Sequence, residues 1–169
     1  MANPFCKVLS QIVSQEIETL LTNEKKMHIG GTYLAMEGPA FSTKAESNLY
    51  RDWGCSIIGM TNHTEARLAK EAEIAYSSLS MVTDYDCWNQ NCENVSVDMV
   101  IENLQENANF AKSIITAAAK RISSLRPSSS FHDALKNALV TQKEHVPNKT
   151  KDKVKLFTDK YWVKKTNRH

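Results

Sequence analysis

Short apolar runs of strand length alternate with amphipathic helical segments along the first half of the chain. Residues 5–21 carry apolar side chains at three-and-four spacing, the pattern of a helix with one buried face. Strand-like runs follow at 27–37, 55–60 and 74–83, and a charged, alanine-containing helical segment over 64–73 separates the last two. This alternation predicts an α/β fold, a twisted mixed, mainly parallel sheet flanked by helices.

Local signals place further element boundaries. Thr43 and Glu46 have capping-box spacing, which predicts a helix over 43–53 that ends at Gly54. The Gly30-Gly31 pair predicts a bulge or bend in the first strand. Later helices are expected at 97–122, where Ser96 can form the cap, at 131–141 beyond the Arg126-Pro127 break, and at 151–165.

The net charge of +2 combines two regions of opposite sign. Residues 142–169 carry nine Lys/Arg against three Asp/Glu, a net charge of +6, whereas residues 1–141 carry a net charge of −4. We therefore expect one domain over 1–169 with a basic helical tail at about 142–169. Such a tail is a solvated lysine-rich helix or a site for nucleic acid or anionic lipid. Binding of nucleic acid is the weakest interpretation, since no base-reading signals accompany the charge.

The lack of a recognisable membrane span or secretory signal favours a cytoplasmic protein. No apolar run reaches the roughly 20 residues that span a membrane, and no secretory signal is recognisable, so a cytoplasmic protein without a membrane partner is expected. In that compartment Cys6, Cys55, Cys87 and Cys92 are expected to be free thiols. Cysteine and histidine do not recur at zinc-ligand spacing, so no metal site is predicted.

Three segments follow the predicted strands and form the candidate ligand site. Open parallel sheets bind ligands at the carboxyl ends of their strands. Residues 37–42, 60–61 and 83–86 lie at or just beyond those ends, so we expect them to converge.

Each candidate residue in these segments has a functional and a structural interpretation. Asp84 and Asp86 point to one side if the segment is extended, and a buried pair would keep one proton, which makes a hydrogen donor or general acid. Both are equally typical of loop or cap positions. Phe41 could stack on a planar ligand or belong to the core, and Met60-Thr61 could form an apolar wall and an anion contact or serve as core and turn.

Several ordered blocks resemble the trimeric nucleoside phosphorylases. Residues 31–47, GTYLAMEGPAFSTKAES, resemble the purine-binding segment of that family, and YRDWG at 50–54 with IGMT at 58–61 resembles the next block. MVTDYDCW at 81–88 is similar to the 5′-methylthioadenosine phosphorylase branch in particular. The resemblance extends from about residue 2 to about residue 125.

The resemblance implies phosphorolysis, in which phosphate attacks the anomeric carbon of a purine nucleoside as the base departs. Asp84 would be the catalytic residue that stabilises the leaving purine by donating a proton or hydrogen bond. The family carries Asn at position 84 and Glu at position 42 in members that cleave 6-oxopurines, so Asp84 and Ser42 imply a 6-aminopurine. The implied substrate contacts are Phe41, Ser42, Met60, Asp84, Asp86, Val97 and Val100, with Thr61 on the phosphate.

The resemblance also implies partners and a departure from the family. It implies a homotrimer with no cofactor, in which a purine nucleoside and inorganic phosphate, the co-substrate, are the ligands. Family members extend further on the N-terminal side, where the first strands and an Arg and a His that hold phosphate lie. The chain is therefore expected to form the C-terminal portion of a phosphorylase domain that lacks its N-terminal strands. A non-catalytic purine-nucleoside binding remnant, or an assembly partner of a full-length homologue, is the alternative.

Overall fold

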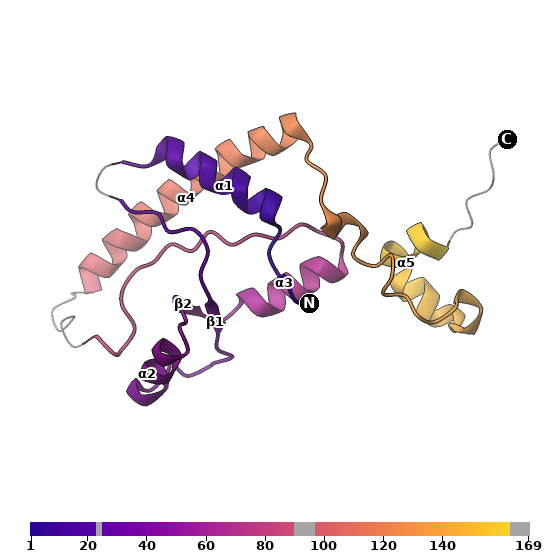
Figure 1. Ribbon diagram of the computed structural model, residues 1–169, viewed down its shortest axis with the longest axis horizontal. Helices are drawn as coiled ribbons and strands as arrows, with labels where there is room; N and C mark the ends of the chain where they lie inside the picture. Colours follow the sequence, from indigo (N-terminus) through magenta and orange to yellow (C-terminus); the bar gives the residue numbers. More distant parts are fainter. Residues whose placement is uncertain (23–24, 90–96, 163–169) are drawn as a thin grey trace.

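A computed structural model describes residues 1–22, 25–89 and 97–162, except the side chains at 97–100 and 102. Helices α1 and α4 lie side by side on one side of the molecule, and a small sheet lies with α2 and α3 on the other (Figure 1). In Figure 1, α5 projects to one side of this body. In chain order the elements are α1 (Lys7–Leu20), β1 (Tyr33–Ala35), α2 (Lys44–Asp52), β2 (Ile57–Gly59), α3 (Asn62–Glu71), α4 (Val97–Leu125), η2 (Ser130–Asp133), η3 (Lys143–His145) and α5 (Asn148–Trp162).

Strands β1 and β2 form the parallel pair that the alternation predicts. Their register places Tyr33 opposite Ile57 and Ala35 opposite Gly59. A Cβ on Gly59 would lie within 1.8 Å of the Tyr33 hydroxyl oxygen, so the tyrosine side chain occupies the space above this glycine. Gly31, in the pair for which the sequence predicts a bulge or bend, has a φ of 107°, which glycine adopts without the strain of a side chain. The chain thus has an α/β fold whose sheet, within the described residues, consists of this pair.

Helices α1 and α4 enclose the largest part of the apolar core. Ile12 of α1 and Ile114 and Ala118 of α4 are buried. An ion pair of 2.8 Å between Arg121 of α4 and Glu16 of α1 joins the two helices. Helix α1 confirms the helix predicted for 5–21, although Ile12 is the one residue of its apolar stripe that is fully buried and Val8 and Leu20 are exposed.

Residues 74–83 do not form the strand that their apolar run predicts. The segment is extended and runs between α1 and α3, held largely by isolated hydrogen bonds: Cys6 N–H donates to the Tyr76 carbonyl at 2.7 Å, and the hydroxyls of Ser10 and Ser77 are 2.9 Å apart. On its other side Tyr76 donates to Glu65 of α3 at 2.8 Å, and burial together with this bond raises the pKa of Tyr76 to about 12. A strand needs a neighbouring backbone about 4.8 Å away, and no described strand lies beside this segment.

The helix predicted over 131–141 is also wrong. The chain makes a short 3₁₀ turn, η2, capped by Ser129, and then a series of turns. The Leu135 N–H, which an α-helix would direct to the Phe131 carbonyl, donates instead to Glu73 Oε1 at 3.0 Å. A long-range side-chain acceptor therefore replaces the helical bond.

The remaining helix predictions are confirmed with small shifts in their ends. Helix α2 begins at the predicted capping box, α4 continues three residues past the predicted end, and α5 occupies most of the predicted basic helix. Ser96, the predicted cap of α4, lies outside the described residues. The division of the chain at residue 142 stays a prediction. No helix in the described part of the chain is both long and apolar enough to span a bilayer.

Candidate functional site

The start of α2 fixes the backbone beside Phe41 and Ser42. The Thr43 N–H donates to Glu46 Oε2 at 2.7 Å, and the Glu46 N–H donates to Thr43 Oγ1 at 3.3 Å. Hydrogen bonds from the Thr43 backbone and hydroxyl hold the pKa of Glu46 below its usual value. The Ser42 hydroxyl donates to Met36 Sδ at 3.3 Å, whereas the Phe41 side chain is 87% exposed. An exposed ring next to a capped helix can act as a stacking surface for a planar ligand.

Met60 and Thr61 follow directly after β2. A Cβ on Gly38 would lie 3.3 Å from Met60 Sδ, so the methionine side chain lies against the turn that precedes Phe41. Thr61 is the exposed N-cap of α3, which begins two residues before the predicted start, and its side chain bonds to none of the described helix N–H groups. The first N–H groups and the dipole of a helix attract anions, so Thr61 presents a hydroxyl where a phosphate oxygen could bind.

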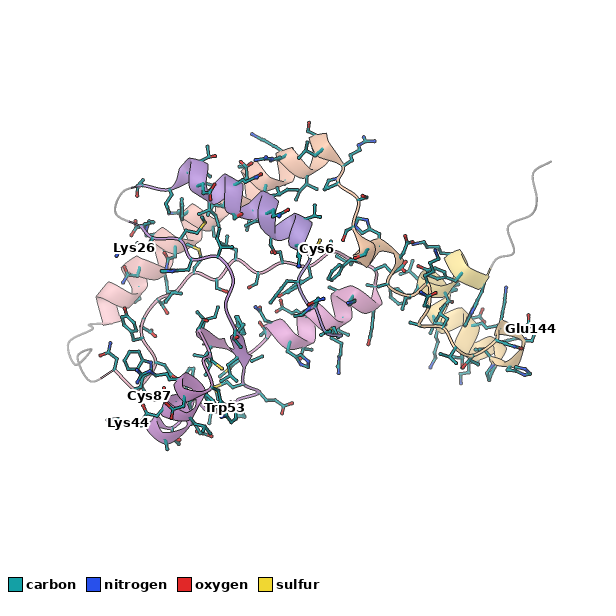
Figure 2. The ribbon with its side chains drawn as sticks, in the orientation of Figure 1. Cys6, Lys26, Lys44, Trp53, Cys87 and Glu144 are labelled. Atoms are coloured by element: carbon teal, nitrogen blue, oxygen red, sulfur yellow. The ribbon has the colours of Figure 1, made fainter. Side chains whose placement is uncertain are left out.

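Residues 83–88 form a loop that carries both candidate carboxylates. The Thr83 hydroxyl donates to Asp84 Oδ2 at 3.3 Å, and the Cys87 N–H donates to Asp86 Oδ1 at 2.8 Å. The Cys87 thiol lies 3.5 Å from the Ser42 carbonyl oxygen, to which it can donate. Figure 2 shows Cys87 beside Lys44, the first residue of α2.

The structure brings the three predicted segments together. Met60 lies against the Gly38 turn, and Cys87, the residue after the predicted segment 83–86, contacts Ser42, so residue 60 and the loop 83–88 both lie against residues 37–42. Asp84 is exposed and Asp86 only partly buried, so the two carboxylates do not form a buried pair in this chain. The role of Asp84 as a hydrogen-bond donor therefore stays a prediction.

The side chains of two predicted substrate contacts lie outside the described part of the structure. Val97 and Val100 belong to the first turn of α4, but their side chains are outside the described part of the structure. Their predicted position against the 5′ substituent stays a prediction.

Two residues that sequence reasoning did not single out hold the loop against α2. The Arg51 guanidinium carbon lies 3.8 Å from the centroid of the Trp88 ring, and Tyr85 meets the same ring edge-on with centroids 5.6 Å apart. An aromatic pair inside an otherwise polar loop was the available signal, because a polar loop gains little from tryptophan unless the ring has a partner.

The described residues hold no cluster of three or more His, Cys, Asp or Glu side chains suited to a metal ion. The polar groups of the site are instead hydroxyls, a helix N-terminus and two carboxylates. This set can contact a planar base and an anion.

Comparison with known proteins places the chain in a family. Residues 1–120 match the model of the phosphorylase superfamily, which is most of the chain. The protein is therefore a member of the phosphorylase superfamily, and all three converging segments lie inside the matched region.

The similar proteins with curated names include methylthioadenosine phosphorylases from several bacteria. S-methyl-5′-thioadenosine phosphorylase of Prochlorococcus marinus is 63% identical over 164 residues, which are 97% of this chain and 52% of that protein. The protein of the same name from Thermosynechococcus vestitus is 49% identical over 160 residues, 95% of this chain and 55% of that protein. The chain thus spans about half the length of the curated relatives it matches.

Solved structures show the same relationship. A methylthioadenosine phosphorylase from an antarctic soil metagenomic library matches with a TM-score of 0.88 and 43% identity, over 93% of this chain and 55% of that one. Methylthioadenosine phosphorylase from Schistosoma mansoni in complex with adenine matches with a TM-score of 0.62 and 34% identity, over 73% of this chain and 48% of that one. The chain shares the nucleoside phosphorylase fold over the region it covers.

Proposed function

We propose that this chain carries the purine-binding part of an enzyme that cleaves S-methyl-5′-thioadenosine with inorganic phosphate. The products are adenine and 5-methylthioribose 1-phosphate, so the enzyme is a pentosyltransferase. The observation that supports this most is the meeting of residues 37–42, 60–61 and 83–88 beside α2 and α3. The names of the relatives supply the substrate.

In the proposed reaction the phosphate lies near Thr61, and the negative charge of the leaving purine develops near Asp84. A phosphate oxygen forms a bond to the anomeric carbon as the bond from that carbon to the purine nitrogen breaks. The bonding electrons leave with the purine, and a proton or hydrogen bond from Asp84 stabilises the charge that develops on its five-membered ring. Thr61, at the N-terminus of α3, is placed to contact the attacking phosphate.

The remaining proposed contacts decide which nucleoside fits. Phe41 and Ser42 would contact the base and ribose, Met60 the ribose, and Asp86 the base, where a carboxylate accepts hydrogen bonds from an amino group. An apolar wall of Val97 and Val100 would favour a methylthio over a hydroxyl substituent by about 1–3 kcal/mol.

The proposal also covers the co-substrate, the oligomeric state and the cellular compartment of the enzyme. It uses inorganic phosphate as a co-substrate and no cofactor, assembles as a homotrimer, and acts in the cytoplasm on a purine nucleoside. A nucleic-acid role for the tail stays the weakest interpretation, since no base-reading signals accompany its charge.

The test measures adenine release from methylthioadenosine and phosphate. Two proteins are compared, this chain and a chimera that adds the part of the Prochlorococcus relative that the chain does not match. Turnover by either protein supports the proposal, and turnover by the chimera alone shows that the site needs residues outside this chain. If both fail while the intact relative is active under the same conditions, the proposed activity is wrong.

The alternative is a purine-nucleoside binding protein without catalysis, a remnant or an assembly partner of a longer homologue. Coverage of about half of each relative favours it. Calorimetric titration with methylthioadenosine distinguishes the two, because binding without turnover in both proteins would support the alternative.

A further inference from the structure

The stack of Arg51 on Trp88 joins the two sides of the candidate base site. The guanidinium carbon lies 3.8 Å from the ring centroid, close to van der Waals contact. Arg51 belongs to the last turn of α2, and Trp88 is the last residue of the loop that carries Asp84 and Asp86. At this distance the planar cation and the indole face attract both electrostatically and by dispersion.

The loop depends on such side-chain contacts for its position. Residues 83–88 contain no helix or strand. The hydrogen bonds of the Asp84 and Asp86 carboxylates come from the adjacent residues Thr83 and Cys87, so they shape the loop but do not attach it to the body. Attachment comes from Trp88 on Arg51, from the Cys87 thiol at the Ser42 carbonyl, and from Asn107 Nδ2 at the Val82 carbonyl, 3.4 Å away.

Helix α2 contacts both the segment that carries Phe41 and Ser42 and the loop that carries Asp84 and Asp86. Its N-terminal capping box holds the backbone that leads from Phe41 and Ser42, and Arg51 projects from its last turn. Helical side chains tilt toward the N-terminus, so the long Arg51 side chain can reach back along the helix to the loop. Consecutive residues of the loop, Cys87 and Trp88, thereby contact Ser42, just ahead of the N-cap of α2, and Arg51 in the last turn of that helix.

We propose that Arg51 and Trp88 are positioning residues that hold Asp84 and Asp86 at a fixed distance from Phe41 and so set the preference for a 6-aminopurine. The inference rests on the proposed function, because it needs a purine between these side chains. The pair acts through the loop and does not contact the substrate. Substitution of either residue is expected to make the positions of the Asp84 and Asp86 carboxylates less fixed. It should leave the position of Thr61 unchanged.

The first experiment tests the geometry without any ligand. In a Trp53→Phe/Trp162→Phe background, Trp88 is the single tryptophan. Arg51→Ala should increase acrylamide quenching of Trp88, and Arg51→Lys should increase it less. The matched control is Arg67→Ala, which removes the same side chain from an exposed position on α3. Quenching that is the same in Arg51→Ala as in the control would overturn the proposal.

The second experiment tests selectivity by calorimetric titration of adenine and of hypoxanthine. Arg51→Ala and Trp88→Ala are each expected to lower the ratio of the two affinities about tenfold. Trp88→Phe, which keeps an aromatic face, should restore most of the ratio, and Arg67→Ala should leave it unchanged. Thermal unfolding midpoints identify a variant that has merely lost its fold, in which case Arg51→Lys and Trp88→Phe decide.

The outcomes separate the inference from the function on which it rests. Selective adenine binding by the unsubstituted chain, retained in Arg51→Ala and Trp88→Ala, overturns the positioning role but leaves the proposed function intact. Failure of the unsubstituted chain to bind either purine contradicts purine binding by this chain, and the positioning role fails with it. A lowered ratio with rescue by Trp88→Phe supports both.

Discussion

Asp84 is the residue on which the base preference depends. Its carboxylate is exposed in a loop and accepts one hydrogen bond from Thr83. In the proposed reaction one oxygen of the Asp84 carboxyl group donates to the five-membered ring of the purine, and the other can accept a hydrogen bond from the 6-amino group of adenine, which a 6-oxopurine lacks. Residue identity at this position therefore has a direct chemical consequence for the ligand.

Asp84→Asn is expected to shift the preference toward 6-oxopurines. The amide can donate to a 6-oxygen, so the ratio of kcat/KM for adenosine to that for inosine should fall about 10- to 100-fold. The measurement uses whichever protein, chain or chimera, turns over methylthioadenosine. Asp52→Asn, an acid-to-amide change at the exposed end of α2, is the control. An unchanged ratio in Asp84→Asn would contradict the role assigned to this residue.

At the scale of elements, the end of α3 determines how the tail is attached. Ile74 N–H donates to the Ala69 carbonyl and Glu73 N–H to that of Lys70, a Schellman end in which Glu73, with a φ of 57°, occupies the position that usually holds glycine. Its carboxylate accepts hydrogen bonds from Leu135 N–H, from Tyr161 and from Lys160. One strained residue thus joins α3 to the turn after η2 and to α5.

The attachment of α5 is expected to weaken in acid. Although desolvation alone would raise the pKa of Glu73, hydrogen bonds from Tyr161, Leu135 N–H and Lys160 hold it below its usual value. A lowered pKa in the folded state means that the stabilisation is complete above the unfolded value, about 4.3, and is lost as the pH falls through the folded value. Emission of Trp162 at the end of α5, in a Trp53→Phe/Trp88→Phe background, should therefore change below about pH 4.

Glu73→Gln should remove this acid transition, because the amide does not titrate. Glu144→Gln, the same change at an exposed position on η3, should retain it. A Glu73→Gln protein with an unchanged acid transition would show that another group controls the attachment.

At the scale of the whole molecule, the chain leaves many large apolar side chains in solvent. Few residues form the buried core, chiefly from α1, α3 and α4. The more exposed apolar and aromatic side chains include Phe41, Trp53, Val82, Tyr85, Ile101, Leu104 and Ile115. Exposure on this scale is typical of surfaces that other protein covers.

The 169-residue chain by itself is expected to bind an apolar dye such as ANS and to associate as its concentration rises. The chimera with the unmatched part of the Prochlorococcus relative should bind less dye per residue, because the added protein would cover part of this surface. Dye fluorescence and sedimentation velocity measure the two effects. Equal dye binding per residue in both proteins would mean that the exposed side chains face solvent in the longer protein too.

Much of the framework of this protein was predictable from the sequence, because those features depend on near neighbours. Helix α2 follows from the Thr43–Glu46 box, α1 from its apolar spacing, and the positive φ before β1 from Gly30-Gly31. The proximity of residues 37–42 and 60–61 was predictable too, since both follow the paired strands β1 and β2, whereas the loop at 83–88 reaches them through Cys87 at Ser42 without a strand ahead of it.

What the sequence could not determine depends on partners far away in the chain. The run at 74–83 has the composition of a strand, yet its extended backbone lacks a described strand beside it. The segment 131–141 has helical spacing, yet Leu135 N–H bonds to Glu73, 62 positions earlier. The stack of Arg51 on Trp88 likewise joins a helix to a distant loop. Local spacing fixes hydrogen bonds within a turn or two, whereas strand pairing, a competing acceptor and a cation over a ring exist only once the chain has folded and brought those groups together.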